Sequence, residues 1–231
     1  MKLGIIGAMV EEITPLLEAV GEYKESKIAN NTFYEASFCG HNLVIVYSKI
    51  GKVNSTLTAT MLIEKFGVEK VIFSGVAGGI NDSLKIGDLI VANKLCQHDL
   101  DITAFGHPNG FVPGGDVFVK TDEKLKNIAL DVANENNIKI IEGTIATGDQ
   151  FVANETRKSF IENTFKADAL EMEGASVAVV CDALNVPCLI LRAISDTADM
   201  DAGFNFDEFL DSSAKNSANF LIKIINKINS H

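Results

Sequence analysis

Residues 187–196 read PCLILRAISD, an apolar run that ends in Ser195 and Asp196. Such a continuous apolar run predicts a β-strand buried on both faces, as in parallel sheets covered by helices. Arg192 interrupts the run, so we expect it to find an acidic or carbonyl partner inside the protein. Ligands bind at the carboxyl ends of strands in open α/β sheets, which makes Asp196 a candidate functional residue. An Asp that caps a following turn would also explain this position.

The rest of the chain alternates short apolar runs with amphipathic segments, which predicts a three-layer α/β/α fold with helices on both sides of a mainly parallel sheet. No linker or repeat divides the sequence, so one domain is expected over residues 1–231. Residues 30–47 resemble a hairpin, which makes the sheet mixed, and residues 105–115 form the longest irregular connection. Further strands are expected at 3–6, 43–47, 71–73, 89–91, 138–146 and 167–172, and helices at 10–20, 54–66, 122–136, 156–165, 174–184 and 206–228.

Two more acids follow expected strands. Glu12 lies on the apolar face of the first helix, three residues after Met9 and four before Leu16. An acid that faces the interior needs solvation, a partner or a function, although a first-turn acid also favours the helix dipole. Glu173 follows the expected strand at 167–172, where a solvated strand end would serve as well. The convergence of Glu12, Glu173 and Asp196 at one sheet edge favours a shared pocket that performs acid–base chemistry.

Composition excludes several classes of function. The chain has 231 residues, is 47% hydrophobic and carries a formal net charge of -11, so a nucleic-acid or anionic-membrane partner is not expected. The four cysteines lack metal-type spacing and favour a reducing cytoplasm. Glu11 and Glu12 come too early for a signal peptide, and no uncharged apolar run is long enough to span a bilayer.

Other motifs point away from alternative chemistries. The glycines at 75–79 lack the lysine of a phosphate loop, and those at 4–7 lack dinucleotide spacing. His98, Asp99 and Asp101 could suggest a metal, but the alternation of apolar residues through 100–104 is typical of a strand edge, so no metal is expected. No Gly-x-Ser-x-Gly motif supports acyl transfer.

Four segments together carry a resemblance to a known family. GIIGAMVEE at 4–12, SKIGKV at 48–53, LEMEGA at 170–175 and RAISD at 192–196 resemble the bacterial 5′-methylthioadenosine/S-adenosylhomocysteine nucleosidases of the purine nucleoside phosphorylase superfamily. The resemblance covers nearly the whole chain. It implies a twisted, barrel-like, mixed central sheet, a homodimer, no metal or redox cofactor, and hydrolysis of the N-glycosidic bond of 5′-substituted adenine nucleosides.

The resemblance also implies roles for the three acids. Asp196 would be the general acid that protonates adenine N7, Glu12 would hold and activate the attacking water, and Glu173 would hydrogen-bond the ribose hydroxyls. This division suits the chemistry, because cleavage leaves negative charge on the base and positive charge on the sugar. Asp196 must then carry its proton near neutral pH.

The remaining implied contacts surround the substrate. Met172 would pack beneath the ribose, Phe151 would stack on adenine and the Val152 backbone would read the base edge. Ile102, Phe105, His107 and Pro113, within the segment Ile102–Pro113, would complete the partner subunit's pocket. The other residues implied in substrate binding are Ala8, Met9, Ile50, Val76, Gly78, Ser195 and Phe206, of which Met9, Ile50 and Phe206 would line the 5′-substituent pocket.

Two positions depart from many family members. Val76 replaces a serine hydroxyl, and His107 replaces a tyrosine. Val76, the residues GAS at 174–176 and the loop at 105–113 resemble the subgroup that also cleaves 6-amino-6-deoxyfutalosine in an alternative menaquinone route. A dual role in methionine salvage and menaquinone synthesis is therefore a hypothesis. The alternatives are a phosphorylase of the same superfamily and a non-catalytic nucleoside-binding protein. A phosphorylase needs cations at the nucleophile, where Glu12 would repel phosphate.

Overall fold

The computed structural model describes residues 1–198 and 202–228, and it has the expected mixed α/β architecture. Its strands are β1 (Lys2–Gly7), β2 (Lys24–Ile28), β3 (Asn31–Phe38), β4 (His41–Tyr47), β5 (Lys70–Gly79), β6 (Leu89–Gln97), β7 (Phe118–Lys120), β8 (Ile140–Thr147), β9 (Ala169–Glu171) and β10 (Cys188–Asp196). Its helices are α1 (Val10–Val20), α2 (Lys52–Glu64), α3 (Glu123–Glu135), α4 (Glu155–Phe165), α5 (Gly174–Ala183) and α6 (Ala202–Ile228), with a 3₁₀ turn at Thr103–Phe105.

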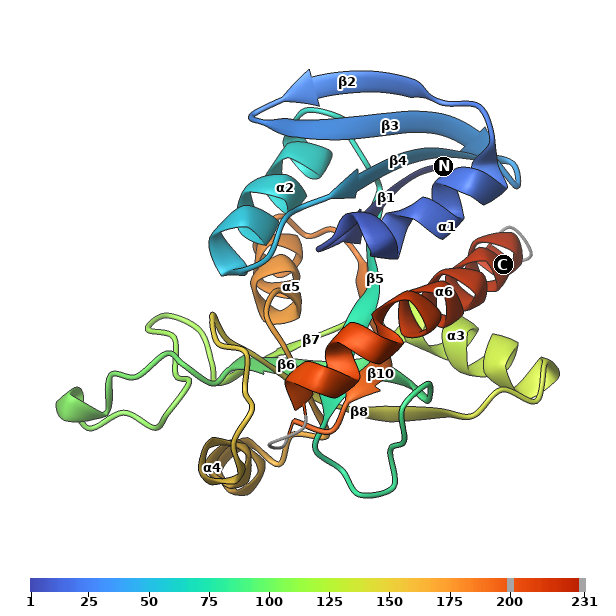
Figure 1. The fold of residues 1–231 in the computed structure, drawn as a ribbon. Helices are drawn as coiled ribbons and strands as arrows, with labels where there is room; N and C mark the ends of the chain where they lie inside the picture. Colours follow the sequence, from blue (N-terminus) through green and yellow to red (C-terminus); the bar gives the residue numbers. More distant parts are fainter. Residues whose placement is uncertain (199–201, 229–231) are drawn as a thin grey trace.

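The sheet closes on itself through β10, which pairs with both β5 and β6. The strands β5, β10, β6, β8 and β9 therefore form a ring, and β1, β4, β3 and β2 extend it from β5 (Figure 1). Pairing is parallel in β4–β1–β5–β10 and in β6–β8–β9, and antiparallel where β10 meets β6, where β5 meets β9 and in the expected β3–β4 hairpin. The barrel-like, mixed sheet is confirmed.

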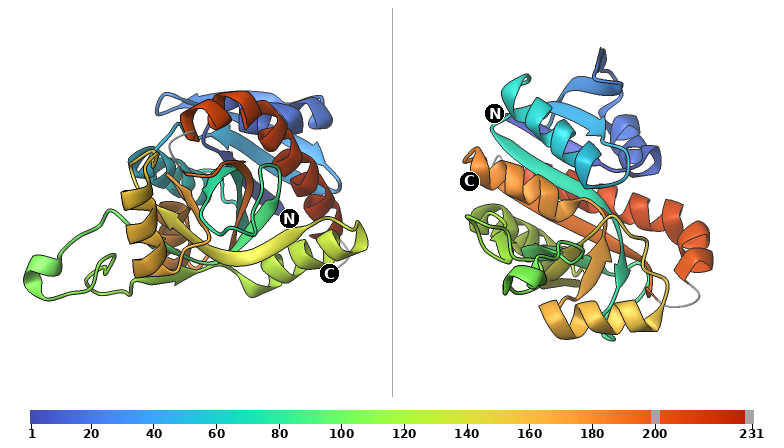
Figure 2. Two further views of the ribbon diagram at one scale, coloured as in Figure 1. Left: turned by 60° about the horizontal axis from the view of Figure 1, so that its bottom comes forward. Right: turned by 90° about the vertical axis from the view of Figure 1, so that its left-hand side faces the viewer.

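Helices cover both faces of the sheet, as the apolar runs predict. On β4, Val44 and Val46 belong to the core beneath α2 and α5, whereas Leu43 and Ile45 belong to the core beneath α1, α3 and α6. Figure 2 shows these two groups of helices on opposite sides of the sheet. Successive side chains of a strand point to opposite faces, so a strand buried on both faces must be continuously apolar.

Several boundaries differ from the expected ones, including that of the strand expected at 89–91, which is Leu89–Gln97. The strand expected at 71–73 continues to Gly79, because its glycine-rich end pairs with β9 and β10, a long-range contact that local propensity does not register. Helix α6 begins at Ala202 rather than at Phe206. The strand edge expected at 98–104 is wrong: β6 ends at Gln97, and residues 98–104 turn away into the 3₁₀ turn.

Within residues 1–198 and 202–228, no helix is long and apolar enough to cross a membrane.

Candidate active site

The three acids share one cavity of about 520 Å³ at the edge where β1, β9 and β10 end. The expected common pocket is therefore confirmed. Glu171, the last residue of β9, also lines it. The full lining is Ala8, Met9, Glu12, Ile50, Val76, Ala77, Gly78, Phe151, Leu170, Glu171, Met172, Glu173, Ser195, Asp196, Gly203, Phe206 and Asp207.

Glu12 is held by backbone N–H groups from two elements. Its Oε1 accepts from Val76 N at 2.9 Å, and its Oε2 accepts from Ala8 N and from Met9 N at 3.2 Å. The contact with Met9 caps helix α1. Glu12 therefore both stabilises the start of the helix and faces the cavity. Burial raises the pKa of Glu12 above its ordinary value, and the charge of Arg192 and the N–H donors oppose that rise.

Glycines let the backbone approach two of these carboxylates. A Cβ atom on Gly75 would lie 2.5 Å from Glu12 Oε1, and one on Gly78 would lie 2.7 Å from Asp196 Oδ1. Both distances are far shorter than real Cβ contacts allow. The glycine-rich end of β5 thus serves the close approach of backbone to acids, a purpose that the sequence pattern left unassigned.

Glu171 forms the interior ion pair that Arg192 was expected to need. Arg192 Nη2 donates to Glu171 Oε2 at 2.6 Å, and the guanidinium lies 4.0 Å from the ring centroid of Phe73. Glu171 also accepts from Glu173 N, from Gly174 N and from the Thr147 hydroxyl. The sequence LEMEGA at 170–175 has two acids at this strand end, Glu171 and Glu173, but it does not show that one of them neutralises Arg192.

Glu173 directly precedes helix α5 and is 5% exposed. Its Oε1 accepts from Gly51 N at 2.8 Å, a contact across 122 residues of sequence. Burial raises the pKa of Glu173, the neighbouring charge of Glu171 raises it further, and the charge of Arg192 and the Gly51 N–H oppose this. This carboxyl therefore holds a proton at a higher pH than an exposed glutamate does.

Asp196 is aimed by an irregularity at the end of β10. The register against β5 shifts between Ile194 and Asp196, which places Ser195 in a bulge. Asp196 Oδ1 accepts from Ala198 N at 2.9 Å, and its Oδ2 accepts from the Ser195 hydroxyl at 3.0 Å. Asp196 is 3% exposed. This carboxyl group therefore lines the cavity while almost none of its own surface is exposed.

Aromatic and apolar side chains form the other wall of the cavity. Phe151, from the loop after β8, is 49% exposed and packs edge-to-face on Phe206 with ring centroids 5.6 Å apart. Met9, Ile50 and Met172 also face this cavity. Val152 lines a small adjoining recess together with Gly78 and Asp196. An exposed aromatic ring beside buried acids suits a planar, partly polar ligand.

Four predicted binding residues lie outside the chain's own cavity. The segment from Ile102 to Pro113 projects from the body of the molecule (Figures 1 and 2), and Phe105 is 81% exposed. His107 is exposed and stacks on Phe111 with centroids 4.7 Å apart. None of these four residues lines the acidic cavity among the residues described.

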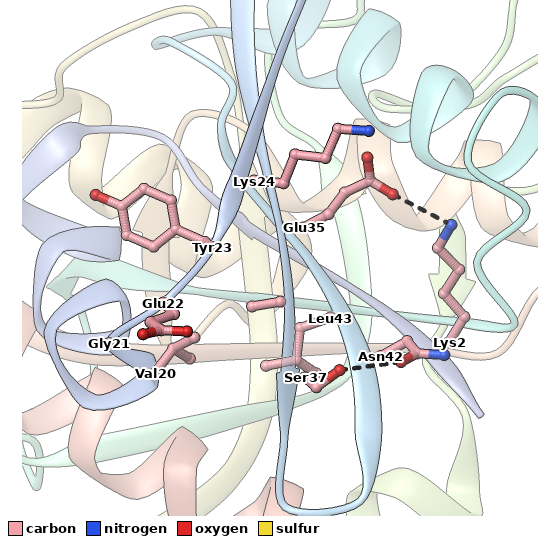
Figure 3. A pocket seen from close by; sticks show the side chains of 11 residues that line it. Lys2, Val20, Gly21, Glu22, Tyr23, Lys24, Glu35, Ser37, Asn42 and Leu43 are labelled. Carbon is pink, nitrogen blue, oxygen red and sulfur yellow. Dashed lines mark hydrogen bonds and ion pairs between the residues drawn. The ribbon is translucent and has the colours of Figure 1, made fainter.

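A second hollow, larger than the acidic cavity, lacks this chemistry. Figure 3 shows it between the end of α1 and the β2–β4 edge, with a volume of about 890 Å³. Lys2 pairs with Glu35 at 3.8 Å there, and Glu22 and Lys24 are exposed to solvent. No group of three metal-ligating side chains occurs within the described part of the chain.

Comparisons with known proteins agree with this geometry. A family model described as the phosphorylase superfamily matches residues 2–226. The chain is 61% identical to the aminodeoxyfutalosine nucleosidase of Campylobacter jejuni over 99% of this chain and 100% of that protein. It is 39% identical to a 5′-methylthioadenosine/S-adenosylhomocysteine nucleosidase of Bacillus cereus over 99% of this chain and 100% of that protein. The Helicobacter pylori nucleosidase of the latter name, in a crystal structure with butyl-thio-DADMe-Immucillin-A, matches with a TM-score of 0.97, 52% identity and 98% coverage of each chain.

Proposed function

The chain belongs to the phosphorylase superfamily, and on this basis we propose that it is an N-glycosyl hydrolase that releases adenine from 5′-substituted adenine nucleosides. The charge pattern of the cavity carries the proposal. Five acidic residues line it, namely Glu12, Glu171, Glu173, Asp196 and Asp207, and none of the described lining residues is Lys or Arg. Such a site stabilises a sugar that becomes cationic.

Each acid has a distinct part in the mechanism. Asp196 donates its proton to adenine N7, so the base leaves as a neutral molecule. Glu12 orients and deprotonates the water that attacks the anomeric carbon, and Glu173 accepts hydrogen bonds from the ribose hydroxyls. The N–H donors around Glu12 and the Ser195 hydroxyl at Asp196 support these assignments because they hold both carboxyl groups in fixed orientations.

The site is better suited to bind water than phosphate as the nucleophile. A bound phosphate needs cationic or N–H donors, but Glu12 already accepts the Val76 and Ala8 N–H groups at the cavity wall. Arg192 is 1% exposed and its charge is directed to Glu171. These contacts favour hydrolysis over phosphorolysis.

The substrates that we propose are 5′-methylthioadenosine, S-adenosylhomocysteine, 5′-deoxyadenosine and 6-amino-6-deoxyfutalosine. They share adenine and ribose, which the acids and Phe151 would hold, and they differ at the 5′ group beside Met9, Ile50 and Phe206. The relative in C. jejuni is named for aminodeoxyfutalosine, and the relative in B. cereus is named for 5′-methylthioadenosine and S-adenosylhomocysteine. A dual role in methionine salvage and menaquinone synthesis follows, with Val76 and His107 as the positions to probe.

A homodimer would complete the site. The projecting segment 102–113 and the exposed apolar side chains Ile50, Val53 and Leu57 support an interface in which Phe105 enters the partner's 5′-substituent pocket. The buried thiols of Cys96, Cys181 and Cys188 are free, which supports a cytoplasmic location.

Adenine release in phosphate-free buffer tests the proposal, with kcat/KM compared between methylthioadenosine and aminodeoxyfutalosine. Similar values would support the dual role. A value for aminodeoxyfutalosine lower by about a hundredfold would confine the enzyme to salvage. Nucleoside binding without adenine release would favour the non-catalytic binding protein, and release that requires phosphate would favour a phosphorylase.

A further inference from the structure

One cluster of charged residues, Lys52, Asp99 and Asp149, joins the start of α2 to the loops that follow β6 and β8. Lys52 Nζ lies 2.7 Å from Asp99 Oδ1, and Asp99 Oδ2 accepts from Asp149 N at 2.8 Å. Asp149 Oδ1 in turn accepts from Lys52 N at 2.8 Å. The three residues follow β4, β6 and β8 respectively. Each contact therefore joins segments that are distant in sequence.

Lys52 and Asp99 are partly shielded from solvent, whereas Asp149 is exposed. The side chains of Lys52 and Asp99 are 18% and 16% exposed. Burial raises the pKa of Asp99, but the hydrogen bonds from Lys52 and from Asp149 N outweigh it and hold the pKa below its ordinary value. Gln97 Oε1 lies 3.3 Å from Lys52 Nζ as a further acceptor. This degree of burial distinguishes the pair from a solvent-screened surface salt bridge.

The cluster lies directly behind two parts of the active site. Gly51, the neighbour of Lys52, donates its N–H to Glu173, and Gly51 has a φ of +98° that favours glycine. A Cβ atom on Gly51 would lie 3.0 Å from Asp149 Oδ1. On the other side, Phe151 follows Asp149 by two residues. None of Lys52, Asp99 and Asp149 lines the cavity itself.

We propose that Lys52, Asp99 and Asp149 are positioning residues that hold the Gly51 N–H against Glu173 and, through the same contacts, fix the loop that carries Phe151. This inference rests on the proposed nucleosidase activity. The cluster acts on Glu173 and on the ring of Phe151 together, because the segments that hold both residues are joined by the same cluster. Its loss misplaces both groups, and a displacement of about 1 Å can lower a rate by about a hundredfold.

By holding the Gly51 N–H in place, the cluster also influences the ionisation of Glu173. The groups that act on this carboxyl are the charges of Glu171, Glu12 and Arg192 and the Gly51 N–H. The N–H opposes protonation, so its displacement leaves burial and the two acidic neighbours less opposed. If the Gly51 loop is released, the acid limb of the pH profile of kcat/KM moves to higher pH.

The test compares Lys52→Met and Asp99→Asn with wild type, with Lys52→Arg as the conservative variant. Lys139→Met is the matched control, because Lys139 also forms an ion pair, with Asp88. Lys139 directly precedes β8 and so lies at the opposite end of that strand from the loop that carries Phe151. We expect kcat/KM for adenine release to fall by about ten- to a hundredfold in Lys52→Met and Asp99→Asn. The acid limb moves to higher pH in both, Lys52→Arg recovers most of the activity, and Lys139→Met matches wild type.

The double variant Lys52→Met/Asp99→Asn should lose no more activity than the single variants, since the two residues act as one unit. The inference is overturned if the folded variants keep kcat/KM within about twofold of wild type, or lose activity without any movement of the acid limb. Wild type serves as the separate test of the proposed function: a wild-type protein that releases no adenine refutes the nucleosidase, whereas an active wild type with unaffected variants refutes only the positioning role. Thermal unfolding of each variant shows whether it is folded.

Discussion

Arg192 Nη2 donates to Glu171 Oε2 at 2.6 Å, and the two side chains are 1% and 2% exposed. The same guanidinium lowers the pKa of Glu12 and of Glu173, against the larger effect of burial. One buried cation thus favours the ionised forms of three buried carboxyl groups around the cavity. Removing one partner from such a site leaves a charge without compensation, which costs far more than the pair itself contributes.

Arg192→Met is therefore expected to lower the free energy of unfolding by about 3–5 kcal/mol. It should also move the acid limb of the pH profile to higher pH, because Glu12 and Glu173 lose the charge that favours their ionised forms. Urea unfolding and the pH dependence of kcat/KM measure the two effects. Lys139→Met, which removes a cation from an exposed ion pair, should change neither. A stability equal to that of wild type would contradict the compensating role of Arg192.

Glu12→Gln separates activity from stability. We expect kcat/KM for adenine release to fall by about 10²- to 10⁴-fold, because glutamine cannot take the proton from water. The stability of the variant relative to wild type, by contrast, should increase. The folded pKa of Glu12 lies above its ordinary value of 4.5, so the stability that its proton provides is complete below pH 4.5 and is lost as the pH rises through the folded value.

The glutamine variant lacks that loss, so its stability relative to wild type should increase as the pH rises above 4.5. Thermal unfolding in a series of buffers measures the difference. A constant difference across this range would show that Glu12 has the same pKa in the folded and the unfolded chain.

Asp196→Asn should abolish most adenine release while nucleoside binding persists. The amide keeps the shape of the side chain but has no proton to give to adenine N7, so we expect kcat to fall by about 10²- to 10⁴-fold. Calorimetric titration with methylthioadenosine measures the binding that remains. Adenine release at the wild-type rate would remove Asp196 from the mechanism.

Gly75→Ala tests the close approach of β5 to Glu12. The new methyl group would lie 2.5 Å from Glu12 Oε1, so the carboxylate must leave the Val76 N–H. We expect a loss of kcat/KM of at least about tenfold in a chain that still folds. Gly115→Ala is the control, since its methyl group would meet the nearest atom at an ordinary 3.6 Å. Equal activity of the two variants would mean that Glu12 tolerates displacement.

Phe105→Ala tests the proposed contribution of the second subunit. The ring is 81% exposed on one chain, so its removal should leave the thermal stability of an isolated subunit nearly unchanged. KM should rise for substrates with large 5′ groups more than for 5′-deoxyadenosine, because only the former reach this ring. Sedimentation at several concentrations gives the oligomeric state. A KM that is unchanged for all four substrates would place Phe105 outside the partner's pocket.

Local patterns account for much of this molecule. The continuous apolar run at 187–194 becomes the buried strand β10, and helix α1 covers the predicted residues 10–20. The three acids after strands were recognisable because a carboxylate is conspicuous where an apolar element should continue. The extension of β5 to Gly79 and the turn at 98–104 were not, because pairing between distant strands and the path of a loop leave no periodic signal.

The division between chain and fold is clearest at Glu171. Its presence at a strand end follows from residues 167–173, as does the need of Arg192 for a partner. Their pairing depends on the ring of strands, which brings β9 beside β5, and β5 beside β10. The pairing of β1 with β4 and with β5 likewise brings Val76 N against Glu12 and Gly51 N against Glu173. Periodicity and polarity are properties of neighbouring residues, whereas hydrogen bonds and pKa shifts depend on distances of a few ångströms between segments that only the folded sheet brings together.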